Sequence, residues 1–452
     1  MPGARPTPPP SAIPLRQIGL YAATAITVGN IIGSGIFRSP HSVAQQLGTL
    51  PLVLAAWILG GVLSIAGSLV LAELAVAHPR TGGLYVFIRE AFGDVWGFVF
   101  GWANLWVIKP TVIASITSVF ALYFCEALHL PAGTQFGVGA AAILLLTAVN
   151  VLGVREGAGT QSLFTTLKVL GIILLCGAAF LLPHRGPDPG AVAAAAPVMP
   201  PLMLGFVAAM ISILFAYDGW TDSTYVAGEI KDPGRVLPIA ILGGTALVIV
   251  VYVLTNLAYY AVLNPAEVAG FEAVGSETVR RVLGTWGAQA LAVLVAISTF
   301  GTTNGAILTG PRVTQAMAAD GLLWNWASRL HLKRGTPDTA LWLQAGLSVL
   351  WLGLSRGFED VSGWFVTTSW LFYGLTTAAI FVHRKRFKAG DADVHPYRTP
   401  LYPLTPILFV VVTVVLIVSD LTASGWRACA GVGIAATGIP VYWFWKRKST
   451  YS

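Results

Sequence analysis

The sequence predicts an all-α integral membrane protein with about twelve transmembrane helices, the first and sixth of them discontinuous. Of the residues, 55% are hydrophobic and only 10% are charged, whereas a soluble protein carries about 25% charged residues. Apolar stretches of about twenty residues, the length that spans a bilayer, recur along the chain. Glycines interrupt two of these stretches, at 27–37 and 212–222. Non-helical backbone at membrane depth is tolerated only where protein or a cavity surrounds it, so both interruptions indicate a binding site.

The apolar stretches set the order of elements. Expected spans lie at 16–37, 51–77, 95–124, 136–153, 160–182, 202–226, 237–262, 286–311, 338–355, 361–382, 402–420 and 425–445. Residues 1–15, rich in proline and small residues, are expected to form a disordered cytoplasmic tail without a signal peptide. Residues 446–452 are expected to form a cytoplasmic C-terminal tail. The part between, 16–445, is expected to be one transporter domain.

The distribution of basic residues predicts the orientation of the chain. Most Lys and Arg residues fall in loops that this span order places on the same side as the N-terminus. Basic loops stay in the cytoplasm, so both termini are expected there, in a multi-pass protein of the cell membrane. The net charge of +7 then needs no nucleic-acid partner. The basic run at 383–388 is expected to anchor the chain and to contact membrane lipid.

The positions of the two interruptions predict an internal repeat. They open spans one and six, which divides the chain into five-span halves at 16–182 and 202–382, with extra spans at 402–445. A repeat with an odd number of spans is inverted relative to its copy. Inverted repeats with discontinuous helices are typical of carriers that work by alternating access.

The chemistry of the interruptions indicates an α-amino acid as the substrate. An opening at Gly33, Ser34 and Gly35 exposes backbone N–H groups at a helix start, which favour a carboxylate. An opening near Asp218 and Gly219 exposes carbonyl oxygens at a helix end, which favour an ammonium group. The alternative is that the glycines only allow close packing of helices.

Three of the charged residues within the expected spans are candidates for a role at membrane depth. Asp218 is expected to bind the substrate amine, pair with a basic residue or carry a proton, unless it only lines water at a helix end. Lys168 either extends to the cytoplasmic surface or is a buried ammonium that replaces a sodium ion or exchanges a proton. Lys109, next to Pro110, is expected to have a structural role in a kinked helix, with a second functional cation as the alternative.

Other acidic residues are expected near the membrane surface. Asp222 and Glu229 are taken as solvated loop charges, with salt-bridge gating as the alternative, and Glu73 is expected to pair with Arg80 or Arg89. No nucleotide, metalloprotease or serine-hydrolase motif is present, so neither an enzyme nor a cofactor is expected. The cysteines show no spacing typical of a metal site.

Several segments resemble the amino acid–polyamine–organocation transporter superfamily, and most closely its L-type amino acid transporter branch. These segments are GNIIGSGIF at 29–37, FAYDGW at 215–220, EIKDPGRVLP at 229–238, VYVLTNLAYY at 251–260, GPRVTQAMAADG at 310–321, SWLFYGL at 369–375 and YRTPLYP at 397–403. The resemblance implies a LeuT-like five-plus-five inverted repeat.

The resemblance also implies roles for individual residues. The carboxylate is expected at Gly33, Ser34 and Gly35 with Ile31 close by, and the amine at Phe215, Ala216 and Asp218. Phe215 is expected to be an aromatic gate over the substrate. Lys168 is expected to place its ammonium in a vacant sodium site, and Tyr259 to steady both breaks.

The activity that the resemblance implies is sodium-independent exchange of neutral, small L-amino acids. A proton-coupled symporter and a non-transporting amino acid sensor are the alternatives. Asp218 departs from the glycine of several L-type carriers and leaves side-chain preference open. Cys125 falls within an expected helix, so no obligatory disulfide-linked heavy subunit is expected. The residues carry no prediction of oligomeric state.

Overall fold

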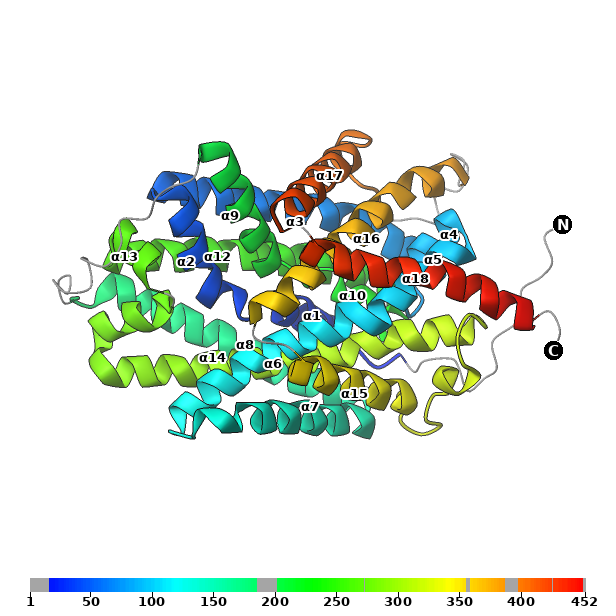
Figure 1. The fold of residues 1–452 in the computed structure, drawn as a ribbon, viewed down its shortest axis with the longest axis horizontal. Helices are drawn as coiled ribbons and strands as arrows, with labels where there is room; N and C mark the ends of the chain where they lie inside the picture. Colours follow the sequence, from blue (N-terminus) through cyan, green and yellow to red (C-terminus); the bar gives the residue numbers. More distant parts are fainter. Residues whose placement is uncertain are drawn as a thin grey trace.

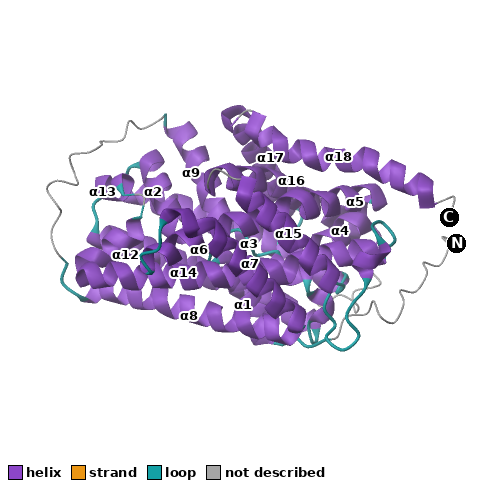
Figure 2. Ribbon diagram, turned by 60° about the horizontal axis from the view of Figure 1, so that its bottom comes forward, coloured by secondary structure: helices purple, strands orange, loops and turns teal. Residues whose placement is uncertain are grey.

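A computed structural model of the chain describes residues 16–184, 201–271, 273–354, 358–386, 397–424 and 426–449. Within these ranges the chain is helical, with short loops between the helices (Figure 2). An isolated β-bridge joins Ile18 to Ile230. The predicted disordered tail, 1–15, lies outside the described residues.

The helices follow the order of the predicted spans. They are α1 (Leu20–Ile31), α2 (Gly35–Leu47), α3 (Leu50–Ala77), α4 (Leu84–Phe92), α5 (Asp94–Ala103), α6 (Lys109–Ala127), α7 (Gln135–Leu152), α8 (Val154–Leu181), α9 (Leu202–Ala216), α10 (Asp222–Tyr225), α11 (Pro233–Pro238), α12 (Gly244–Val262), α13 (Pro265–Gly270), α14 (Val274–Ala319), α15 (Asp338–Leu354), α16 (Phe358–Arg386), α17 (Leu404–Ser424) and α18 (Trp426–Ser449).

Nine helical stretches in the described ranges are long and apolar enough to cross a membrane. Helices α9 and α15 are shorter, with 15 and 17 residues. The structure therefore describes a multi-pass membrane protein, and the count of twelve spans stays a prediction. Large apolar side chains on the outer surface of α8 and α17, such as Leu174 and Val414, are exposed. Such a surface suits a lipid environment better than water.

The interruptions of the two discontinuous spans lie near the centre of the bundle, beside α1 and α10. Helix α1 packs against α8, α12 and α14, and α10 lies beside α1 and α14 (Figure 1). Helices α7 and α15 form one edge in this view, while α9 and α17 lie toward the opposite edge (Figure 1). The glycine-containing segments are thus enclosed by protein, as non-helical backbone at membrane depth requires.

The predicted third span is interrupted before its proline rather than kinked at it. A π-helical turn at Asn104–Ile108 separates α5 from α6, which begins at Lys109. Pro110 has no N–H to donate to the carbonyl four residues earlier, that of Trp106. The indole nitrogen of Trp351 donates to this carbonyl at 2.9 Å. Helix α15 therefore satisfies the group that the proline leaves free.

Several predicted boundaries differ from the structure; helix α2, for example, continues to Leu47, beyond the predicted end of the first span at 37. Helix α14 begins at Val274, well before the predicted span, and bends at Gly284, where φ is +76°. A residue with a side chain rarely adopts this conformation, which explains the glycine. Helix α18 continues to Ser449. The first part of the predicted C-terminal tail, 446–449, is therefore helical, and 450–452 lies outside the described residues.

Candidate functional site

The first predicted span is interrupted between α1 and α2. Helix α1 ends at Ile31 and α2 begins at Gly35. The last carbonyls of α1 have no partner within the helix. Two of them, the carbonyls of Gly29 and Ile32, lie 3.0 and 2.9 Å from the hydroxyl of Thr302 in α14, whose single proton they share.

The sixth predicted span is interrupted between α9, which ends at Ala216, and α10, which begins at Asp222. Gly219 in this turn has φ of +116°. A Cβ at this position would lie 2.6 Å from the backbone carbon of Asn30. Gly219 thus allows the two interruptions to touch, and only glycine fits both the dihedral angle and the space.

A cavity lies where the two interruptions meet. It is lined by Asn30, Ile31, Gly33, Ser34, Gly35, Val112, Ile116, Phe215, Ala216, Asp218, Thr302 and Phe365. Seven of the eight residues predicted to bind substrate are therefore brought together, and the eighth, Gly219, packs against Asn30. Within the described part of the chain, the Ser34 hydroxyl is buried without a hydrogen-bond partner. A buried polar group without a partner is costly, so a ligand atom here would relieve the cost.

Aromatic and aliphatic side chains give the cavity an apolar wall. Phe215 and Phe365 meet edge to face, with ring centroids 6.1 Å apart. Val112 and Ile116 of α6 lie among the other lining residues. The sequence indicated Phe215 as a gate, but the residues from α6 and α16 carry no local signal and come to the cavity only through helix packing.

Lys168 of α8 points into the interruption of the first span. Its side chain is fully buried. The ammonium donates to the carbonyls of Gly29 and Ile32 at 2.9 and 2.7 Å, and to the Thr302 hydroxyl at 2.7 Å. An ammonium has three N–H donors, and all three find acceptors here. This geometry excludes the interpretation that Lys168 extends to the cytoplasmic surface.

Tyr252 joins the two interruptions directly, a contact that the resemblance led us to expect of Tyr259, whose own role stays a prediction. The Tyr252 hydroxyl lies 2.9 Å from the carbonyl oxygens of both Ile31 and Ala216, and its single proton is shared between them. The Tyr259 hydroxyl instead donates to the Ile36 carbonyl at 3.4 Å. Pro40 in α2 leaves that carbonyl without its helical donor.

The two tyrosines show how far the sequence could lead. They stand seven residues apart, which is about two helical turns, and so share a face of α12. Both lie within the segment VYVLTNLAYY, which carries part of the resemblance. Which of the two hydroxyls reaches both interruptions depends on the position of α12 along its own axis. That position is set by the packing of the whole helix bundle.

Several acidic residues expected in solvent are buried. Asp222 pairs with Lys109 at 2.9 Å, and Glu229 pairs with Arg312 at 3.0 Å. Glu73 pairs with Arg384 of α16 at 2.7 Å instead of with a neighbouring loop arginine. These corrections share one cause: helices distant in sequence supply the partners.

Asp218 faces the cavity and is held by an aromatic side chain. The Tyr373 hydroxyl of α16 donates to its carboxylate at 2.6 Å. The carboxylate also lines the cavity beside Ala216. Asp218 therefore lies at the cavity, and its role as a ligand of the substrate stays a prediction.

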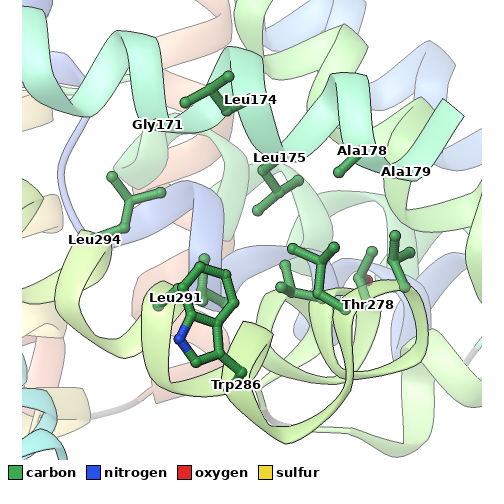
Figure 3. A pocket seen from close by; sticks show the side chains of 13 residues that line it. Gly171, Leu174, Leu175, Ala178, Ala179, Thr278, Trp286, Leu291 and Leu294 are labelled. Carbon is green, nitrogen blue, oxygen red and sulfur yellow. The ribbon is translucent and has the colours of Figure 1, made fainter. Parts of the chain in front are cut away.

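A larger cavity of about 270 Å³ lies elsewhere, between α8 and α14 (Figure 3). Gly171, Leu175, Leu291 and Leu294 contribute to its walls, and the Trp286 ring stands among them (Figure 3). The lining residues are almost entirely apolar, so this cavity offers nothing to hold the charged ends of an amino acid. The smaller cavity at the interruptions is the better candidate despite its size.

Comparison with known proteins agrees with this geometry. The model of the amino acid permease family matches residues 18–437. The chain belongs to this family. The permease is 31% identical over 436 residues to the serine/threonine exchanger SteT of Bacillus subtilis (strain 168), covering 96% of this chain and 97% of that protein.

Two mammalian relatives are similar over comparable lengths. The permease is 34% identical over 456 residues to the large neutral amino acids transporter small subunit 2 of Homo sapiens, covering 96% of this chain and 81% of that protein. It is 32% identical over 442 residues to the Asc-type amino acid transporter 1 of Mus musculus, covering 96% of this chain and 82% of that protein. The resemblance to the superfamily and its L-type branch is confirmed, and with it the expectation of a transporter rather than an enzyme.

The two tyrosines of α12 provide a direct test of how the permease holds its interruptions. Replacing Tyr252 by phenylalanine removes the hydroxyl that joins Ile31 to Ala216 and leaves two buried carbonyls without it. We expect the free energy of unfolding to fall by about 1–3 kcal/mol and amino acid uptake to slow. Thermal unfolding and uptake into vesicles measure the two effects.

Tyr259→Phe is the matched control for this substitution. Its hydroxyl is 3.4 Å from its acceptor, which is a weak hydrogen bond. We expect a clearly smaller effect on both measurements. Equal losses in the two variants would show that the hydroxyl of Tyr252 has no special role at the interruptions.

Proposed function

We propose that the permease is a sodium-independent exchanger of neutral, small L-amino acids that works by alternating access. The observation that carries this proposal is the position of the Lys168 ammonium. It lies 2.9 and 2.7 Å from the carbonyl oxygens of Gly29 and Ile32, and 2.7 Å from the Thr302 hydroxyl. Such a set of oxygens suits a monovalent cation, and a covalently attached one already fills it.

The proposed substrate pose follows from the two interruptions. The carboxylate would lie at the start of α2, where Gly35 and Ile36 belong to the first turn and present N–H groups that the helix does not use. The buried Ser34 hydroxyl would donate to the same group. The ammonium would lie at the end of α9, near the carbonyls around Phe215 and the carboxylate of Asp218.

The cavity wall supports a neutral side chain of modest size. Val112, Ile116, Phe215 and Phe365 line the cavity. These side chains offer no partner to an added charge. The carboxylate of Asp218 would then pair with the α-ammonium group of the substrate, and not with its side chain.

The proposed setting is a cell membrane, with twelve spans in two inverted halves and both termini in the cytoplasm. The basic loops identified in the sequence support this orientation. We propose that no disulfide-linked heavy subunit is required. Cys125, the cysteine nearest the loop after α6, is buried and lies 3.5 Å from the Thr134 hydroxyl.

A proton-coupled symporter is the second candidate, and Asp218 is the observation that favours it. Its carboxylate lines the cavity and accepts a hydrogen bond from Tyr373. A carboxyl group at this position would be placed to carry a proton together with the substrate.

Exchange requires amino acid inside the vesicle, whereas symport requires a proton gradient across its membrane. We expect uptake of labelled serine, alanine or leucine into proteoliposomes to require unlabelled amino acid inside and to be equal in sodium and choline chloride. Uptake into empty vesicles that follows an inward proton gradient would replace the exchanger with the symporter. Uptake that requires sodium would contradict the role given to Lys168.

A further inference from the structure

A network of buried polar side chains begins at Asn30, one of the residues that line the cavity. Asn30 is the residue before the last one of α1. Its amide nitrogen donates to the Asp222 carboxylate at 2.6 Å. This hydrogen bond joins the first residue of α10 to the end of α1, next to the cavity proposed for the substrate.

An ion pair lies at the centre of this network. The Lys109 ammonium is 2.9 and 3.0 Å from the two carboxylate oxygens of Asp222. Their side chains are only 6% and 8% exposed. The Thr309 hydroxyl of α14 contacts both ions, at 3.3 Å from Lys109 and 3.2 Å from Asp222. Helices α1, α6, α10 and α14 meet at these four side chains.

The same asparagine extends the network in the other direction. Gln161 of α8 donates to the side-chain amide oxygen of Asn30, Oδ1, at 3.2 Å. Asn304 of α14 donates to Gln161 at 3.3 Å and accepts from Asn150 of α7 at 2.8 Å. Both discontinuous helices are thus connected to four further helices through buried side chains.

Two further contacts lie beyond the network, toward the end of the molecule where α1 begins. Glu229 and Arg312 form a second buried ion pair at 3.0 Å. The Glu229 carbonyl accepts from the backbone N–H of Ile18 at 2.9 Å, and Ile18 bridges to Ile230. These contacts join the chain before α1 and the segment after α10 to each other and to α14.

We propose that the Lys109–Asp222 ion pair, with Asn30, is a releasable closure that positions the two discontinuous helices and must separate each time the cavity opens toward the α1 end. This inference rests on the proposed alternating access and identifies a part of the machinery that performs it. Lys109 and Asp222 act through the helices that they join, and are therefore positioning residues.

The chemistry of an ion pair suits a closure that has to open. An ion pair taken out of water gains little net free energy, because the cost of desolvating both charges offsets their attraction. When the path from the cavity to the α1 end opens, water hydrates both ions again, so the open state regains the solvation free energy that the closed state loses. An apolar plug of the same size would be more stable when closed and would resist opening. Compared with such an apolar group, the charged pair brings the closed and open states closer in free energy. Compared with two neutral amides, which form weaker hydrogen bonds, the charged pair still favours the closed state.

A cysteine in the cavity reports whether the path is open. Val112 lines the cavity, and Val112→Cys in a background with Cys125, Cys176 and Cys429 replaced by alanine gives one reactive thiol. A membrane-impermeant thiol reagent is added to the side that carries the α1 end. We expect the thiol to react about tenfold faster, or more, when Lys109→Gln and Asp222→Asn are combined, because neutral amides replace the charge-assisted hydrogen bonds of the closed state with weaker ones.

The double variant removes both charges, so no uncompensated ion stays buried. Without the reporter cysteine, we expect it to bind amino acid with a dissociation constant within about threefold of wild type, while its exchange rate changes. Lys109→Arg with intact Asp222 should restore slow labelling. Arg80→Gln, which breaks the exposed pair with Glu90, is the matched control and should leave labelling unchanged.

The outcomes separate this inference from the proposed function. Unchanged labelling in a folded double variant would overturn the closure, whatever the permease transports. If the double variant does not fold, Thr309→Val removes one hydroxyl that contacts both ions, and it must still speed labelling for the inference to stand. Wild-type protein that labels slowly but does not exchange amino acids would contradict the proposed function and leave the closure intact.

Discussion

Lys168→Ala is expected to lower amino acid exchange by about a hundredfold or more, while the protein remains folded. The substitution removes a buried ammonium that donates to Gly29, Ile32 and Thr302. Hydrogen bonds of charged groups contribute about 1.5–3 kcal/mol each. A loss of about 2.7 kcal/mol in the rate-limiting step corresponds to a hundredfold, so the loss of two such bonds is sufficient. Initial rates of exchange in loaded proteoliposomes measure the effect.

The control for this substitution is another lysine on the same chain. Lys231 is exposed, and Lys231→Ala should leave exchange within about twofold of wild type, as surface substitutions usually do. Size-exclusion profiles and thermal unfolding establish that Lys168→Ala is folded. Full exchange by a folded Lys168→Ala protein would show that the interruption of the first span does not need the ammonium.

Gly35→Val is expected to abolish substrate binding. A Cβ at this position would lie 2.5 Å from the α-carbon of Ala216, which is closer than such atoms approach. The first turn of α2 would have to move away from the end of α9, and the two proposed ends of the site would separate. We expect the dissociation constant to rise by about a hundredfold or more, because misplacing a binding group by an ångström has effects of this size. Binding of labelled amino acid to purified protein measures it.

Gly243→Val introduces the same side chain where no atom lies within 4 Å of the added Cβ. It should bind amino acid as the wild type does. Unchanged affinity in Gly35→Val, with a normal thermal unfolding profile, would place the substrate somewhere other than the meeting point of α2 and α9.

The interruptions were predictable because their cause is local. Glycines at 29, 33, 35 and 219 stand in apolar stretches where a continuous helix would favour other residues. In the structure, the helical conformation is interrupted at Ile32–Gly33–Ser34 and around Gly219. Composition and the spacing of apolar stretches likewise suffice for an all-helical membrane protein.

The partners of the charged residues were not predictable, because their cause is distant. Asp222 stands next to polar residues in the sequence, and only the docking of α6 and α1 against α10 buries it with Lys109 and Asn30. Thr302 carries no motif, yet it contacts the same carbonyls as Lys168. Residues of this kind are defined by the register between helices, which a single sequence does not specify.

The covalent attachment of the Lys168 ammonium limits the energy that the proposed exchanger can use. A dissolved cation that binds with its cargo is released on the far side, and its electrochemical gradient then performs work. An ammonium that belongs to the chain returns with the empty carrier and draws on no such reservoir. The proposed exchanger therefore cannot raise the total pool of its substrates; it can only trade one amino acid for another, and the cell's existing pools decide the direction of every turnover.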